Sequence, residues 1–208
     1  AGDVIPQVIE VIKSKRKKEN KEIKVPKNCP VCNSDAYREI LTENKGAITY
    51  EKYIRCTGGF TCSSQAKERL KHFVSKEGFD IDGLGDKQIN DYFDMGIIKD
   101  PTDIFSLEQT YRKNPPQIWV YSSGSKSKIN TIKDSAIKLF KAIDDKKNIN
   151  FDRFIYSLGI RHLGSSTASL LASHFIAFNN MVSVFKLHKL DEIDEVRSLD
   201  GIGDKVVN

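Results

Sequence analysis

The sequence has no long run of apolar residues, and this absence excludes a membrane-spanning helix. Hydrophobic residues make up 39% of the 208 residues and charged residues 29%, and no run approaches the roughly 18 apolar residues that such a helix needs. The opening AGDVIPQVIEVI lacks the charged segment, long apolar stretch and small-residue cleavage site of a signal peptide. We therefore expect a cytoplasmic protein with no membrane partner.

Histidine is also scarce, and this disfavours an enzyme that is complete within the chain. The four histidines are scattered, and no set of nucleophile, base and orienting group is suggested around them. They are His72, His162, His174 and His188. We expect each of them to be an ordinary surface or core residue and not part of a catalytic site.

Cysteine occurs only four times, and all four residues fall in one short segment. They form two close pairs, CPVC and CTGGFTC, separated by 23 residues. Glycines in the second pair permit positive φ and a proline stiffens the first, so four thiolates can converge on one tetrahedral zinc ion. With four protein ligands no position is left for water, so the zinc is expected to be structural. The predicted ligands are Cys29, Cys32, Cys56 and Cys62.

Two other uses of these cysteines compete with zinc binding: a pair of disulfides and a redox-active C-x-x-C. A pair of disulfides requires an oxidising compartment, for which the sequence carries no signal. A redox-active C-x-x-C should open a helix after a strand within a βαβ unit, and no such unit is visible. The zinc interpretation is therefore favoured.

The formal net charge of +5 is modest, but its distribution is uneven. Residues Lys13–Lys27 contain eight basic and two acidic side chains and lie directly before the cysteine segment. A charge run of this kind is commonly a solvated linker. Its position leaves phosphate contact as an equally good interpretation.

Apolar spacing predicts helices throughout the second part of the chain, joined by short polar connections. Asp100 is expected to cap a helix that Pro101 opens and that points Ile104, Phe105 and Leu107 inward. The segment Asn114–Lys128 is expected to be a loop. The other predicted helices begin at Gln65, contain Ile89–Phe93, and span Thr131–Asp144, Phe151–Leu158, Ser165–Phe178 and Met181–Leu187.

Three short segments at predicted helix joins repeat one pattern. We name them turn A (Asp82–Lys87, DGLGDK), turn B (Arg161–Ser166, RHLGSS) and turn C (Asp200–Lys205, DGIGDK). Each has an apolar residue between small or permissive ones, which describes the helix-hairpin-helix motif. A fourth copy is expected near residues 130–135, but NTIKDS has no glycine and is degenerate.

This pattern is suited to binding the phosphates of a DNA backbone. Glycine allows the main chain to approach a phosphate, and the N–H groups that open the following helix donate to its oxygens. A single such turn is more often a packing turn between helices, but three copies favour DNA binding that is independent of sequence. The predicted contacts are Gly83, Gly85, Lys87, Gly164, Ser165, Ser166, Gly201, Gly203 and Lys205.

The chain resembles the bacterial NAD-dependent DNA ligases, from their zinc finger through their helix-hairpin-helix domain. The resemblance rests on CPVC, on RCTGGFTCSSQAKERLKHFVSKEGFDIDGLGDKQI and on FIYSLGIRHLGSSTASLLASHF, in the family's order. The opening AGDVIPQV is similar to the last strand region of the family's OB domain. The gap between the cysteine pairs is longer than usual, so Tyr37–Tyr53 is expected to form a longer β-hairpin.

The resemblance implies a fold class that is mainly α with a small β-containing zinc finger. A tandem helix-hairpin-helix domain would follow a four-cysteine zinc knuckle. The expected domains are residues 1–26 (end of the OB domain and basic linker), 27–66 (zinc finger) and 67–208 (helix-hairpin-helix domain, truncated at its end). Because the chain opens on Ala1 and stops within the last hairpin, we expect a fragment.

The resemblance also implies the function: sealing of nicks in duplex DNA during replication and repair. NAD and Mg²⁺ would serve a missing adenylation domain, since no lysine here precedes x-Asp-Gly. The fragment is expected to be inactive alone and to grip nicked duplex DNA in the minor groove, together with the adenylation and OB domains. The alternative is a free-standing repair module without ligase chemistry.

Overall fold

The structure is a computed structural model that describes residues 7, 9–44, 47–50, 53–122, 131–186 and 190–202. The chain divides into two units, Ala1–Thr57 and Gly58–Asn208. The boundary falls inside the segment 27–66 that the sequence predicts to be the zinc finger. The three domain ranges given above stay a prediction.

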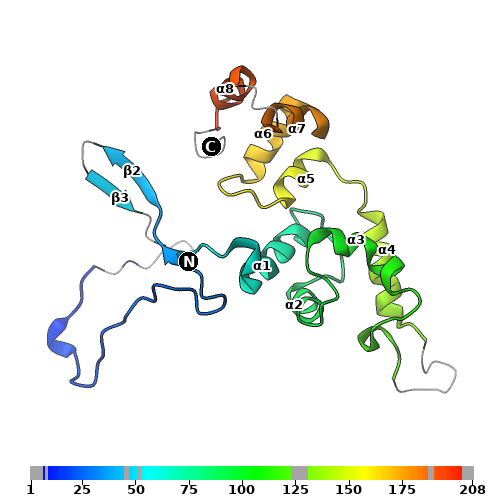
Figure 1. The fold of residues 1–208 in the computed structure, drawn as a ribbon, viewed down its shortest axis with the longest axis horizontal. Coiled ribbons are helices and arrows are strands. Elements are labelled where there is room, and N and C mark those ends of the chain that lie inside the picture. Colours follow the sequence, from blue (N-terminus) through cyan, green and yellow to red (C-terminus); the bar gives the residue numbers. More distant parts are fainter. Residues whose placement is uncertain are drawn as a thin grey trace. The chain divides into compact units, whose positions relative to one another are not determined.

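The first unit is built on two small antiparallel pairs of strands. Strand β1 (Ala36–Tyr37) pairs with β4 (Arg55–Cys56), and between them β2 (Ile40–Asn44) pairs with β3 (Ala47–Tyr50). The register of the inner pair shifts once, close to Ile40. The β2–β3 hairpin is visible in Figure 1 and confirms the hairpin that the spacing between the cysteine pairs predicts.

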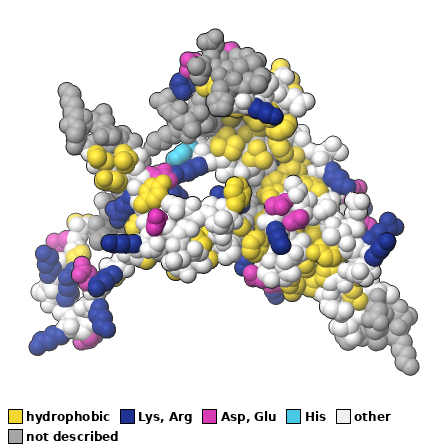
Figure 2. Space-filling model, viewed as in Figure 1, with side chains coloured by type: hydrophobic (Ala, Val, Ile, Leu, Met, Phe, Trp, Pro, Cys, Tyr) yellow, Lys and Arg dark blue, Asp and Glu magenta, His cyan; other side chains and the backbone are white. Residues whose placement is uncertain are grey.

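The basic linker of this unit is extended and solvated. Apart from one short 3₁₀ turn, η1 (Lys13–Lys15), residues 9–28 form no helix or strand beyond a single bridge at Asn28, and all are exposed. Figure 2 shows Lys and Arg side chains gathered along this segment. The expected strand at the start of the chain falls mostly on residues 1–6 and 8, which lie outside the described residues.

The second unit begins with a group of helices that share one core. The helices are α1 (Ser63–Val74), α2 (Asp86–Asp94), α3 (Pro101–Tyr111) and α4 (Asp134–Asp145), and Figure 1 shows them in this order. Their largest fully buried side chains include Leu70, Ile89, Ile104 and Leu107, and Ile98, between α2 and α3, is buried in the same core. The apolar spacing in the sequence thus located the inner face of each helix.

The start of α3 forms as its sequence predicts. The Asp100 side chain accepts a hydrogen bond from the Thr102 backbone N–H at 2.8 Å, and the Asp103 carboxylate accepts one from the Asp100 N–H at 3.2 Å. The Thr102 side chain and the surrounding amides hold the pKa of Asp100 below its usual value. Together with Pro101 at the first helical position, this capping box fixes where the helix begins.

The expected loop at Asn114–Lys128 is partly wrong, because its first half belongs to the core. Residues Gln117–Trp119 form a 3₁₀ turn (η3), and Trp119 is only 3% exposed. The indole packs edge-on against Tyr92, Tyr111 and Phe140. Residues 123–128 of this segment lie outside the described residues.

A second group of helices has its own core. It contains α5 (Phe151–Ser157), α6 (Ser165–Phe175), α7 (Phe178–Lys186) and α8 (Leu190–Ser198). Residues from α5, α6, α7 and α8 meet there, together with one residue from each of turns B and C; the buried set is Ile155, Leu163, Ala168, Leu171, Phe175, Met181, Val184, Val196 and Ile202.

Several helix limits differ from those expected. Helix α4 begins at Asp134 instead of Thr131, and α8 was not anticipated as a separate helix. Helix α6 ends at Phe175 because Ile176 adopts φ of 60°, and the Asn180 side chain donates to the Phe175 carbonyl at 3.1 Å. Helix α6 therefore ends before the expected Phe178, and α7 begins at Phe178 instead of the expected Met181.

Polar contacts join the two helical groups. The Arg153 guanidinium of α5 donates to the carbonyls of Gly78 and Lys76, at 2.9 and 2.6 Å. The His72 ring of α1 lies 2.8 Å from the Tyr156 carbonyl. These bonds hold the segment between α1 and α2 against α5.

In the part of the chain that the structure describes, no single helix is long and apolar enough to cross a membrane. Helices α6 and α7 meet the length and hydropathy criterion only when taken together, and they are bent by 93° at their junction. Both contribute buried residues to the second core.

The buried hydrogen bond between Trp119 and Tyr92 gives a test of this core. The indole N–H donates to the Tyr92 hydroxyl at 2.8 Å. Tyr92→Phe leaves that donor without its partner, so we expect the free energy of unfolding to fall by about 1–3 kcal/mol. Equilibrium unfolding in urea measures the change.

Tyr111→Phe is the matched control. It removes a hydroxyl from another ring that packs on the same indole, with ring centroids 5.6 Å apart, and we expect a smaller loss. Equal losses from both substitutions would contradict a specific role for the Trp119–Tyr92 bond.

Candidate metal centre and nucleic-acid interface

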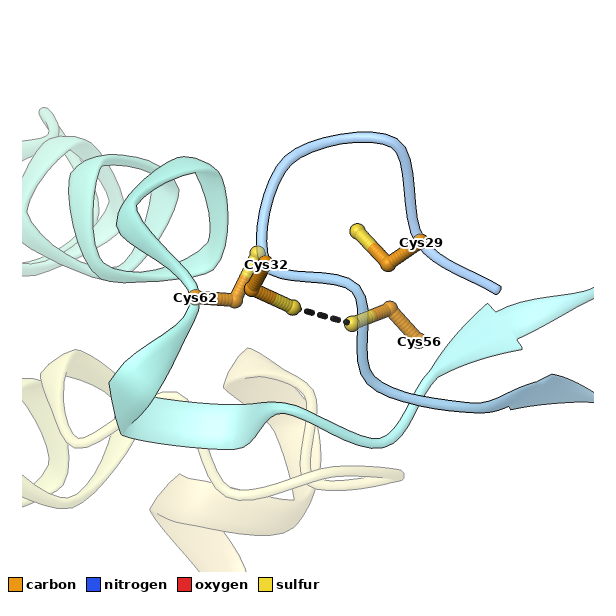
Figure 3. Close-up of side chains that lie close together, drawn as sticks. All are labelled: Cys29, Cys32, Cys56 and Cys62. Carbon is orange, nitrogen blue, oxygen red and sulfur yellow. Dashed lines mark hydrogen bonds between the residues drawn. The ribbon is translucent and has the colours of Figure 1, made fainter.

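The four cysteines lie together, as Figure 3 shows. Their sulfur atoms all lie within 4.8 Å of one another, and those of Cys32 and Cys56 are 3.4 Å apart. Cys62 is 1% exposed and Cys29 is 9% exposed. The structure therefore brings together all four residues that the sequence predicts as ligands.

Local backbone structure positions these sulfurs. The Cys29 N–H donates to the Ser34 carbonyl at 2.8 Å and the Asn33 N–H to the Cys29 carbonyl at 2.9 Å, closing a tight turn around the first pair. Asn33 has φ of 59°, which asparagine tolerates better than most residues. The second pair lies at the end of β4 and at the residue that precedes α1.

The surroundings of the first pair favour the thiolate form. Hydrogen bonds with the hydroxyl and backbone of Ser34 lower the pKa of Cys32 to about 6. Backbone hydrogen bonds from Cys32 and Val31 lower the pKa of Cys29. The thiolate is the form that binds a metal ion. Ser34 was not singled out in the sequence, although a hydroxyl two residues after a cysteine ligand is a readable signal.

This donor set fits a tetrahedral metal ion. With metal–sulfur distances of about 2.3 Å, ligand sulfurs in such a site lie about 3.8 Å apart, which agrees with a cluster whose sulfurs are all within 4.8 Å. No disulfide links these residues. The cluster could hold one metal ion, and its four sulfurs are the ligand type that structural zinc prefers.

Turn A has the backbone that the helix-hairpin-helix pattern requires. Gly83 has φ of 88°, a conformation that favours glycine. The Leu84 N–H donates to the Ile81 carbonyl at 3.3 Å, and Leu84 is 2% exposed. Gly85 precedes α2 with extended backbone and accepts from the Ile89 N–H at 3.0 Å. Lys87 lies exposed in the first turn of α2.

Turn B repeats this geometry with different side chains. His162 has φ of 64°, and the Leu163 N–H donates to the Ile160 carbonyl at 3.1 Å. Gly164 precedes α6 and accepts from the Ala168 N–H at 2.9 Å. Neither α2 nor α6 has a side-chain cap in the described structure. The first N–H groups of both helices therefore stay open to a ligand.

The exposed residues of turn B include two of its predicted contacts. Ser165 and Ser166 open α6 and are both exposed. Their hydroxyl groups can donate to an anion beside the helix N–H groups.

Turn C begins in the same way. Gly201 has φ of 90°, and the Ile202 N–H donates to the Leu199 carbonyl at 3.0 Å. Ile202 is 6% exposed and packs in the second core. Gly203 and Lys205, the other two predicted contacts of this turn, lie outside the described residues.

The expected fourth copy of the pattern, near residues 130–135, does not form the turn seen in turns A and B. Lys133 precedes α4 in the way that Gly85 precedes α2, but Ile132 forms a bridge with Val120. The Lys133 ammonium donates to the Ile118 carbonyl at 2.9 Å. The side chain of Lys133 is thereby committed to the protein, which agrees with our assigning no DNA contact here.

Comparison with known proteins gives these turns a family context. A family model described as a helix-hairpin-helix motif matches residues 153–207. The DNA ligase of Rhizobium johnstonii is 42% identical over 213 aligned residues, which cover 99% of this chain and 28% of the ligase. The chain is homologous to one region of the DNA ligases.

Two further DNA ligases support this relationship. That of Rhodospirillum rubrum is 46% identical over 86% of this chain and 24% of its own length. That of Parvibaculum lavamentivorans is 40% identical over 98% of this chain and 28% of its own length. The chain thus spans about a quarter of the length of these DNA ligases, and the helix-hairpin-helix motif fits DNA binding.

The cysteine cluster predicts a measurable dependence on metal. Cys29→Ser removes one of four ligands, so we expect the bound zinc to be lost and the melting temperature to fall. Metal content by mass spectrometry and thermal unfolding, both on the same sample, provide the measurement.

The control for this substitution is Ser34→Ala, which removes a hydrogen bond to Cys32 but keeps all four sulfurs. We expect this variant to retain its zinc. A Cys29→Ser protein with unchanged zinc content and melting temperature would rule out the four-thiolate site.

Proposed function

We propose that this chain is the DNA-binding, non-catalytic part of an NAD-dependent DNA ligase that seals nicks in duplex DNA. The observation that carries the proposal is the repeated turn geometry of turns A, B and C in a chain homologous to DNA ligases. Related turns that expose their backbone beside a helix start form a set of sites for successive phosphates.

Each turn would bind a phosphate through its main chain. In turns A and B the residue with positive φ turns the chain back, the apolar residue after it enters the core, and the exposed residue before the helix leaves room for a phosphate. The open N–H groups of the helix then donate to the phosphate oxygens. Such contacts carry no base information, so binding is independent of sequence.

The cysteine cluster would hold one structural zinc ion. When bound, the ion supplies a rigid cross-link between the two cysteine pairs and no reaction chemistry. The chain's own contribution is to hold the four thiolates close together, with the lowered pKa of Cys29 and Cys32 reducing the cost of deprotonation.

The ligase chemistry is assigned to another part of the parent protein. There, NAD would adenylate a lysine and Mg²⁺ would assist, while this chain contains no lysine before x-Asp-Gly. We propose that this chain alone does not seal DNA and that it grips the minor groove with the adenylation and OB domains. A cytoplasmic location belongs to the same proposal.

The alternative of a free-standing repair module is disfavoured by the homology. The similarity to DNA ligases runs over 98–99% of the chain in two of the relatives above. It therefore includes the linker and the cysteine segment as well as the hairpins.

Gly164 offers a clean test of DNA binding. Its φ of −86° is open to any residue, and an added Cβ meets no heavy atom within 4 Å in the described structure. Gly164→Val should therefore change the free energy of unfolding by no more than about 1 kcal/mol. We expect it to weaken binding to a nicked duplex by about 1–3 kcal/mol, because the side chain blocks the phosphate.

Ser173→Val places the same side chain at the exposed far end of α6 and serves as the control. Fluorescence anisotropy with a labelled nicked duplex measures the affinity of both variants. Wild-type affinity should also fall with salt, with a slope of log K against log salt of about −0.9 per phosphate neutralised. Equal affinities for both variants, or a flat salt dependence, would contradict phosphate binding at turn B.

A further inference from the structure

Helix α1 carries three lysine or arginine side chains in alternate positions, and they differ in their partners. Lys67 Nζ lies 2.6 Å from Asp94 Oδ1, and Lys71 Nζ lies 2.7 Å from Glu68 Oε1. Arg69, between them in sequence, has no acidic partner within the part of the chain that the structure describes. Its Nη1 atom is buried and has no hydrogen-bond partner. A buried guanidinium nitrogen without a partner is costly and calls for an explanation.

An aromatic ring fixes the position of the Arg69 guanidinium. The guanidinium carbon lies 4.0 Å from the centre of the Phe60 ring, which belongs to the 3₁₀ turn η2 (Gly59–Thr61). Phe60 is 84% exposed, so burial of the ring does not account for this contact. Stacking covers one face of a guanidinium and leaves the N–H groups in its plane available to donate. Arg69 is thus held as a planar donor.

Arg69 lines a cavity of about 420 Å³ between α1 and the residues around turn B, which we call the α1 cavity. The wall opposite α1 includes Gly159, Ile160 and Leu163, and Figure 1 shows the connection from α5 to α6 next to α1. Ser64 of α1 adds an exposed hydroxyl group to the lining. Leu163 is the third residue of turn B, so the cavity directly adjoins that turn.

The other ionisable side chains of the α1 cavity already have partners. Glu68 lines the cavity and its carboxylate would oppose an anion, but the ammonium group of Lys71 offsets this charge. The Nε2 atom of His72 lies 2.8 Å from the Tyr156 carbonyl oxygen. The charge that remains to attract a ligand is the positive charge of the Arg69 guanidinium.

We infer that the α1 cavity binds a phosphate group of the DNA backbone, with Arg69 as its main ligand. This inference rests on the proposed DNA-binding function and adds a side-chain site beside the proposed main-chain site of turn B. A guanidinium presents paired N–H groups that match two oxygens of a phosphate, and the Ser64 hydroxyl can donate to another. The bound phosphate would compensate the one charge that α1 leaves unpaired.

Arg69→Gln tests the site, because it removes the charge and keeps a side chain that favours helix. The loss of one phosphate contact should lower the slope of log K against log salt by about 0.9 in magnitude. Affinity for a labelled nicked duplex should fall about tenfold at low salt. Fluorescence anisotropy across a salt series measures both quantities. Circular dichroism and thermal unfolding check that the variant folds.

Lys67→Gln is the matched control. It removes one positive charge from the same helix, at a residue that pairs with Asp94 and also lies over an aromatic ring, 5.6 Å from the centre of Phe93. We expect its salt slope to equal that of the wild type. Arg69→Lys keeps the charge without the planar pair of donors, so it should retain the slope and lose about threefold in affinity.

A second arm of the experiment distinguishes DNA from free phosphate, which offers the same oxygens. Inorganic phosphate is added to the wild type and to Arg69→Gln during thermal unfolding, with chloride at equal ionic strength as the reference. A ligand that binds only the folded state raises the melting temperature. A rise that depends on Arg69, together with an unchanged salt slope for the duplex, would overturn the assignment to DNA and leave a site for free phosphate.

The remaining outcomes separate this inference from the proposed function. A shallower slope in Arg69→Gln alone supports the site. A wild-type slope in Arg69→Gln, or equal losses of slope in Arg69→Gln and Lys67→Gln, would overturn it and leave DNA binding at the turns intact. Absence of wild-type binding to duplex DNA would overturn the proposed function, and the phosphate titration would still decide whether the cavity binds this anion.

Discussion

A buried apolar side chain in the third position of each turn anchors the turns to the cores of the second unit. Leu84 lies in the first core and Leu163 and Ile202 in the second, each less than 9% exposed. Their burial fixes the main chain around them, so that the residue before turns back with positive φ. In turns A and B the residue after stays exposed. Removal of that anchor would free the backbone that the proposed phosphate sites require.

Because of this anchoring, different residues of one hexapeptide serve folding and the proposed binding. The positive φ and the buried residue serve the fold, whereas the exposed residues around them make no contribution to either core. Aspartate or arginine can therefore stand in the first position without disturbing the turn, as Asp82 and Arg161 do. A chain built in this way can change the charge of each proposed phosphate site without changing the fold of the turn.

Much of this architecture could be predicted from the sequence because its signals are local. The cysteine spacing, the capping residues Asp100 and Pro101 and the repeated turns depend on neighbours in the chain, and the structure confirms their geometry. Trp119 could not be placed in this way, since its partners Tyr92 and Phe140 are distant in sequence. The end of α6 could not be predicted from the sequence either. Ile176 has positive φ there, a conformation that β-branched residues rarely adopt.

The degenerate fourth position shows how one side chain can remove a site of this kind. Alignment on the helix starts places Thr131 where turn A has Gly83 and turn B has His162. A β-branched residue such as Thr131 resists positive φ more strongly than glycine or histidine.

Here Ile132 pairs with Val120 in an antiparallel bridge, and the Thr131 carbonyl accepts a hydrogen bond from the Tyr121 N–H at 3.0 Å. That pairing needs the segment before it to lie alongside, which the burial of Trp119 provides. It also places Lys133 within reach of the Ile118 carbonyl. Three features of this position therefore depend on one another: no glycine precedes the helix, the segment around Trp119 is packed in the core, and the side chain of Lys133 is bound to the protein. Together they explain why this position lacks the features of a phosphate site.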